Sequence, residues 1–287
     1  MTHVVARGTP TPAQEYLEKI IQELITETGR QQDRHIINLY CYQVEGKSGV
    51  SIKNSEVLKG AVEVANALTV SGIQRGDTAC LVSWNSVQFA KVFYGCLFAG
   101  VVINSVVDYE ICYCLKSTKA KIIFAEQTKV KEVQVALKES QLDCMVVVLN
   151  CDSEGDRHGG MEYAVFCQLY NGICDINEPD DVMTLTLTSG STGIGLPKLA
   201  MNTYSSFVAQ AASPWAYDEV PQPTRMIFLV YSAQWMAHIF IFSAYPIFGV
   251  TLLVQSQSAN AENMLYCVKT YKVNYDTCYW FYYNLLD

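Results

Sequence analysis

A run of glycine, serine, threonine and lysine at 188–198 is the part of the sequence best suited to chemistry. It reads TSGSTGIGLPK and follows alternating Thr and Leu residues that predict a strand over 183–188. Glycines let backbone N–H groups turn toward one point without a Cβ clash, and such groups form an anion-binding concavity. The hydroxyl groups and the terminal lysine add further donors, so the run predicts a phosphate site.

The residues expected to bind a nucleotide phosphate are Thr188, Ser189, Gly190, Ser191, Thr192, Gly193 and Lys198. Two other phosphate motifs do not fit the run. The P-loop requires Lys where Leu196 stands, and the dinucleotide fingerprint requires a third Gly where Lys198 stands.

Composition excludes several other classes of function. Of 287 residues, 50% are hydrophobic and 17% are charged, so we expect a large buried core. The net charge of −8 and the lack of a basic patch argue against nucleic acid as a partner. The 11 cysteines are scattered without a Cys-x-x-Cys pair, so we expect reduced, buried thiols, no metal site and a reducing compartment such as the cytoplasm.

Two apolar stretches, 92–107 and 226–261, could suggest a membrane protein. A spanning helix needs about 20 consecutive apolar residues, and the first stretch is too short. The second is interrupted by Gln234, His238 and Pro246. We therefore expect no membrane span, and interpret 226–261 as a buried helix followed by a buried strand.

Strand and helix patterns alternate along most of the chain. Helices are expected over 11–28, 57–68, 87–99, 128–139, 234–247 and 260–271, and strands near 80–82, 101–103, 122–124, 145–149, 183–188, 226–230, 250–254 and 273–279. This alternation predicts an α/β fold with largely parallel sheets covered by helices. Residues 150–181 are interpreted as a solvated surface loop within one domain.

The loop resembles the motif Thr-Ser-Gly-Ser/Thr-Thr-Gly-x-Pro-Lys-Gly of adenylate-forming (AMP-binding) enzymes, which include acyl-CoA synthetases, 4-coumarate-CoA ligases and luciferases. Further resemblance lies in ANAL at 65–68, GIQRGD at 72–77, FAGVV at 98–102, the segment 115–124, PDD at 179–181 and KTYKV at 269–273. Two departures stand out: three residues separate Gly193 from Pro197, where the family usually has one, and Leu199 replaces the final Gly.

The resemblance implies that residues 1–287 are an incomplete N-terminal large domain of stacked sheets, with the phosphate loop at 186–199 and the C-terminal lid domain absent. It also implies ATP-dependent activation of a small carboxylic acid to an acyl-adenylate, with transfer to coenzyme A. ATP, Mg²⁺ and coenzyme A are the implied cofactors, with the loop near the departing phosphates. Relatives are cytoplasmic or peroxisomal.

Gln234 and Trp235 align with a position where many relatives carry His in the substrate pocket. The indole N–H can donate a hydrogen bond but cannot accept a proton. Trp235 is therefore interpreted either as a pocket residue or as a core aromatic. His238 is expected to be a helix residue with a partner rather than a substitute base, and no catalytic residue is assigned.

Relatives continue with a Mg²⁺-binding Glu, a ribose-binding Asp and a catalytic Lys, so we expect these 287 residues alone not to turn over. Two alternatives stay open. The first is a non-catalytic relative that binds a nucleotide, an acyl chain or another protein, which the altered loop spacing favours. The second is an unrelated membrane or phosphate-binding protein.

Overall fold

The computed structural model describes twelve parts of the chain, and the expected helix over 11–28 lies outside them. The described residues are 42–46, 48–107, 111–151, 159–168, 178–188, 197–207, 209, 226–230, 232–248, 251–255, 260–273 and 275–276.

The larger sheet has seven strands. Their spatial order is β7 (Met161–Glu162), β6 (Met145–Leu149), β5 (Ile122–Glu126), β3 (Thr78–Val82), β4 (Val102–Ser105), β8 (Val182–Leu187) and β9 (Leu199–Thr203). Every neighbouring pair is parallel except β8 and β9, which form an antiparallel hairpin.

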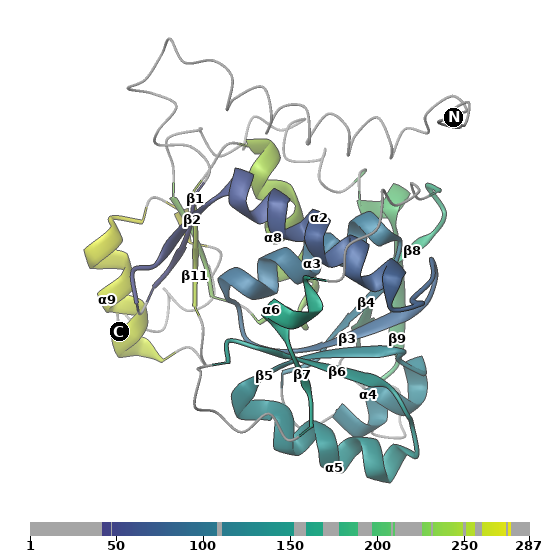
Figure 1. The fold of residues 1–287 in the computed structure, drawn as a ribbon. Coiled ribbons are helices and arrows are strands. Elements are labelled where there is room, and N and C mark those ends of the chain that lie inside the picture. Colours follow the sequence, from purple (N-terminus) through teal and green to yellow (C-terminus); the bar gives the residue numbers. More distant parts are fainter. Residues whose placement is uncertain are drawn as a thin grey trace.

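Helices cover both faces of this sheet (Figure 1). On one face lie α2 (Asn54–Val70) and α3 (Val87–Ala99); on the other lie α4 (Ile111–Thr118) and α5 (Val130–Ser140). Successive residues of β3 therefore enter different cores: Ala79 and Leu81 pack in the first, and Cys80 and Val82 in the second. A strand buried on both faces is apolar throughout, which explains its sequence.

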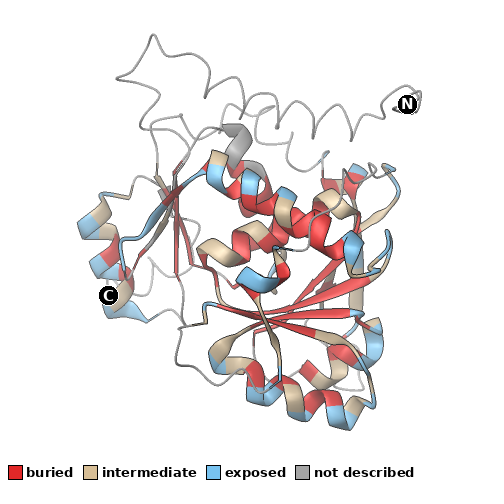
Figure 2. Ribbon diagram, viewed as in Figure 1, coloured by how far each residue is buried: buried red, intermediate tan, exposed pale blue. Residues whose placement is uncertain are grey.

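The smaller sheet has five strands, in the order β12 (Tyr275–Asp276), β10 (Met226–Leu229), β11 (Thr251–Val254), β1 (Tyr42–Glu45) and β2 (Ser51–Lys53). Only β2 runs antiparallel to its neighbour. Ile227 and Leu229 of β10 join the same core as α2, α3 and α8 (Met236–Phe248), whereas Phe228 packs with Met264 of α9 (Ala261–Tyr271). The two sheets thus share this core, and Figure 2 colours its residues red together with all other buried residues.

The fold class is confirmed as mixed α/β with mostly parallel sheets flanked by helices. The described residues also include elements that the sequence patterns did not predict, namely β1, β2, α4 and β9. The interpretation of 150–181 as a surface loop is wrong for 161–166. There β7 pairs with β6 and α6 (Tyr163–Phe166) follows, because the fully buried Phe166 ring packs on Phe124 with ring centroids 5.5 Å apart.

An ion pair links the turn before β3 to the start of β8. The Arg75 guanidinium donates to the Asp181 carboxylate, with Nε 2.7 Å from Oδ2. The side chains are 40% and 33% exposed, so solvent weakens the attraction. The pair joins two segments that carry the family resemblance.

The described residues of 226–261 form β10, α8, β11 and the start of α9. Within the described residues, no helix has the length and apolar character needed to cross a bilayer. Instead α8 and β11 pack in the shared core, as expected.

Close packing of α2 on α3 depends on a small residue at position 95. A Cβ on Gly95 would stand 2.5 Å from Val64 Cγ1 and 2.9 Å from the Ala61 carbonyl oxygen. At Gly60 of α2, by contrast, the three nearest atoms all belong to the Lys91 side chain, which can swing away. These two glycines therefore make a matched pair.

We predict that Gly95→Ala lowers the free energy of unfolding by about 1–3 kcal/mol, because the new methyl forces the helices apart. Gly60→Ala is the control: it should leave stability unchanged or raise it by up to about 1 kcal/mol, since alanine is the better helix former. Urea unfolding measures both. Equal effects of the two substitutions would contradict the packing argument.

Candidate functional site

The β8–β9 hairpin closes the glycine-rich loop at its neck. Leu187 pairs with Leu199 as the last rung of the ladder. Beyond it the Thr188 N–H donates to the Lys198 carbonyl oxygen at 2.8 Å, and the Lys198 N–H donates to Thr188 Oγ1 at 3.0 Å. Thr188 and Lys198 are thus brought together, as a phosphate loop requires.

Of the predicted phosphate-binding residues, only Thr188 and Lys198 are described. Ser189, Gly190, Ser191, Thr192 and Gly193 lie outside the described residues, so their roles stay predictions. Lys198 is exposed. A hydroxyl can accept and donate at once, so the contact of Thr188 with Lys198 leaves its O–H hydrogen for another acceptor.

A second contact fixes the exit of the loop. The Tyr113 hydroxyl, from α4, donates to the Pro197 carbonyl oxygen at 2.6 Å, and Pro197 itself is buried. The sequence analysis did not single out Tyr113. No local pattern could have shown this contact, because its partners are 84 residues apart.

Gln234 and Trp235 precede α8 and lie at the same edge of the seven-stranded sheet as the neck. The Val107 N–H, just beyond β4, donates to Gln234 Oε1 across a long 3.4 Å. Strand β4 neighbours β8, which leads into Thr188. Trp235 is 55% exposed and is therefore not the core aromatic of the alternative interpretation. Ligands of open α/β sheets commonly bind beyond such carboxyl edges.

His238 is buried in the first turn of α8. Its Nε2 lies 2.7 Å from Asn85 Oδ1, and its ring stacks on Phe242 with centroids 5.0 Å apart. Nδ1 is buried without a hydrogen-bond partner among the described residues. Burial lowers the pKa of His238 to about 3, so the imidazole is neutral at pH 7. This matches the expectation of a helix residue with a partner and does not favour a substitute base.

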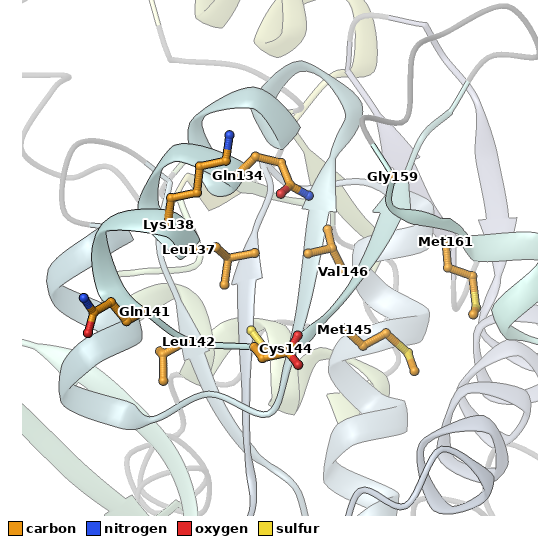
Figure 3. Close-up of a pocket in the computed structure, with 11 residues that line it drawn as sticks. Gln134, Leu137, Lys138, Gln141, Leu142, Cys144, Met145, Val146, Gly159 and Met161 are labelled. Atoms are coloured by element: carbon orange, nitrogen blue, oxygen red, sulfur yellow. The ribbon is translucent and has the colours of Figure 1, made fainter.

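A separate cavity of about 530 Å³ opens at the opposite, amino-terminal edge of the sheet (Figure 3). Leu137 of α5, Cys144 before β6 and Met161 of β7 are among its lining residues. Burial and the nearby Asp143 raise the pKa of the Cys144 thiol to about 11, so the thiol stays protonated and is a poor nucleophile. The cavity does not belong to the loop site.

In the part of the chain that the structure describes, no group of three His, Cys, Asp or Glu residues is placed to hold a metal ion. The expectation of no metal site stays a prediction. The structure describes eight of the cysteines. Of these, Cys80, Cys96, Cys114 and Cys267 are buried, and the other four are partly exposed.

Comparison with known proteins decides the family. The family model described as AMP-binding enzyme matches residues 27–279. The chain belongs to this family. The resemblance inferred from the loop is thereby confirmed.

Individual relatives agree with this assignment. The chain is 26% identical over 202 residues to 4-coumarate–CoA ligase 1 of Petroselinum crispum, which covers 61% of this chain and 34% of that protein. It therefore spans about a third of the length of this AMP-binding relative.

Solved structures of AMP-binding enzymes share the fold. The luciferase-like enzyme of the nonluminescent Zophobas morio mealworm matches with a TM-score of 0.73 at 21% identity, over 90% of this chain and 57% of that one. The anthranilate CoA ligase in complex with anthranoyl-AMP matches with a TM-score of 0.70 at 15% identity, over 88% and 48%.

The buried His238 predicts that stability depends on pH. The pKa of His238 is about 3 in the folded chain and 6.5 ordinarily. As pH falls, His238 therefore binds a proton in the unfolded chain before it does so in the folded chain. The stability contributed by the neutral ring is complete above pH 6.5 and declines toward pH 3. Between pH 7 and pH 5 this group alone lowers the free energy of unfolding by about 2 kcal/mol.

His238→Gln should remove that part of the pH dependence, whatever its effect on stability at pH 7. Urea unfolding of both proteins at pH 7 and pH 5 measures it. The contributions of the other histidines cancel when the change in the free energy of unfolding is compared between the two proteins. An unchanged slope would show that His238 titrates normally.

Proposed function

We propose that this chain provides the phosphate-binding part of an ATP-dependent acid–thiol ligase. A carboxylate oxygen would attack the α-phosphorus of ATP, breaking its bond to the oxygen that bridges to the β-phosphorus. Acyl-adenylate forms and pyrophosphate leaves. A thiolate, that of coenzyme A in the simplest case, then attacks the acyl carbon and AMP leaves.

The observation that carries the proposal is the closed neck of the loop. It holds a hydroxyl, Thr188, beside an exposed lysine, Lys198, at the carboxyl edge of a parallel sheet. Held in that place, their donors could bind charge that develops on the departing pyrophosphate without reorganising during the reaction. Ser189, Ser191, Thr192 and the glycines of the loop would add hydroxyl and backbone donors.

The donor set fits a polyphosphate, and Mg²⁺ would accompany it. Mg²⁺ is commonly held by one or two carboxylates together with substrate phosphates, so a cage made by the protein alone is not required. When bound, it would neutralise phosphate charge. Gln234 and Trp235 would line the pocket for the small carboxylic acid, the exposed indole contributing an apolar wall and an N–H donor.

In domain terms, we propose that residues 1–287 correspond to the N-terminal part of the large AMP-binding domain, with the phosphate loop at 186–199. The family match over 27–279 supports this placement.

Lys198→Ala should weaken ATP binding by about 1.5–3 kcal/mol, because it removes a charge-assisted contact with phosphate. Calorimetric titration of Mg-ATP into both proteins measures the difference. Lys131→Ala, which removes an exposed lysine from α5, is the control and should leave the affinity unchanged. Equal affinities of wild type and Lys198→Ala would remove this loop from the site.

Deleting Ile194 and Gly195 restores the spacing usual in the family and should increase the affinity for ATP. The reason is that fewer residues then separate the glycines from Lys198. The same titration tests this. Weaker binding, or loss of the cooperative unfolding transition, would mean that the loop has a geometry of its own.

The altered spacing also favours a second candidate, a relative that binds nucleotide without catalysis. Isotope exchange between pyrophosphate and ATP, with a panel of fatty and aromatic acids, tests this candidate. Exchange with any one acid would contradict it and name the substrate class, whereas ATP binding without exchange is expected of these 287 residues under either candidate.

A further inference from the structure

The peptide unit between Pro197 and Lys198 is fixed from both sides. Its carbonyl oxygen accepts from the Tyr113 hydroxyl at 2.6 Å, and its N–H donates to Thr188 Oγ1 at 3.0 Å. Because a peptide unit is planar, two hydrogen bonds at its opposite sides prevent it from rotating about its own axis. The backbone from which the Lys198 side chain extends is therefore held in one orientation.

The two bonds come from different parts of the fold. Thr188 belongs to the loop itself, directly after β8. Tyr113 belongs to α4, which is anchored by the buried side chains of Ile111, Cys114 and Leu115 in the core between α4, α5 and the sheet. The Tyr113 hydroxyl therefore ties the end of the loop to α4 and, through α4, to the core of the domain.

Proline makes this contact more important than it would be elsewhere. Pro197 has no backbone N–H, so its carbonyl is the polar backbone group through which its own position can be held. Pro197 is buried, whereas Lys198, the next residue, is exposed. Between these two residues the chain passes from the interior of the protein to its surface.

We propose that Tyr113 is a positioning residue that sets the direction in which Lys198 projects from the phosphate loop. This inference rests on the proposed function, because it assumes that Lys198 binds a phosphate. Tyr113 acts through Lys198 and needs no contact with the nucleotide.

Tyr113→Phe removes the hydroxyl and keeps the ring. We expect it to weaken Mg-ATP binding about three- to ten-fold, the effect of losing one hydrogen bond. In the Lys198→Ala background the same substitution should have no effect, because the group that it positions is gone. A purely structural role would weaken binding equally in both backgrounds and would overturn the inference.

A measurement without nucleotide tests the positioning directly. Hydrogen exchange of the Lys198 amide should accelerate in Tyr113→Phe, since the peptide unit is released on one side. Tyr266→Phe, on the exposed face of α9, is the matched control and should change neither exchange nor affinity. An unchanged Lys198 exchange rate overturns the inference, while faster exchange in a chain that never binds ATP counts against the proposed function instead.

Discussion

The aromatic contact between α3 and α8 is the interaction on which the arrangement of the two sheets depends. Phe242 of α8 packs edge-on against Phe93 with centroids 5.3 Å apart, and it accepts a hydrogen bond from the Tyr94 hydroxyl through its carbonyl oxygen. Helix α3 covers the larger sheet, while α8 connects β10 to β11 of the smaller one. Residues of both sheets therefore meet in one apolar cluster. In the first turn of α8, shortly after Gln234 and Trp235, the His238 ring stacks on Phe242, and its Nε2 lies 2.7 Å from Asn85 Oδ1.

The loop site depends on a different kind of constraint, because hydrogen bonds to backbone rather than apolar burial hold its ends. The neck is made of backbone and one hydroxyl, and the exit is held by one phenol. Such directional contacts define the orientation of a peptide group, which burial alone does not. The rigid sheet fixes where the loop begins. The hydrogen bonds at Pro197 and Lys198 fix the orientation of the backbone that carries the Lys198 side chain.

The sequence predicted features with a local signature and missed those that depend on distant partners. Apolar strands such as β3 and the end of α3 at Gly100, which adopts φ 67°, follow from patterns within a few residues. Strand β1 could not be predicted in this way, since its Gln43 pairs with the distant Leu252 of β11 as well as with Ile52 of β2. The loop motif located the candidate site for the same local reason. Tyr113, and Asn85 as the partner of His238, were beyond reach because their contacts span 84 and 153 residues.

The closed neck of the hairpin also bears on how the loop can change in evolution. Residues 188 and 198 are joined by two hydrogen bonds, so the chain between them is a ring whose ends do not move apart. Each inserted residue adds about 3.5 Å of contour to that ring. The entropy lost in closing it rises only slowly with length. Insertions such as the extra residues after Gly193 therefore lengthen the segment between Thr188 and Lys198 while leaving the register of β8 and β9 intact.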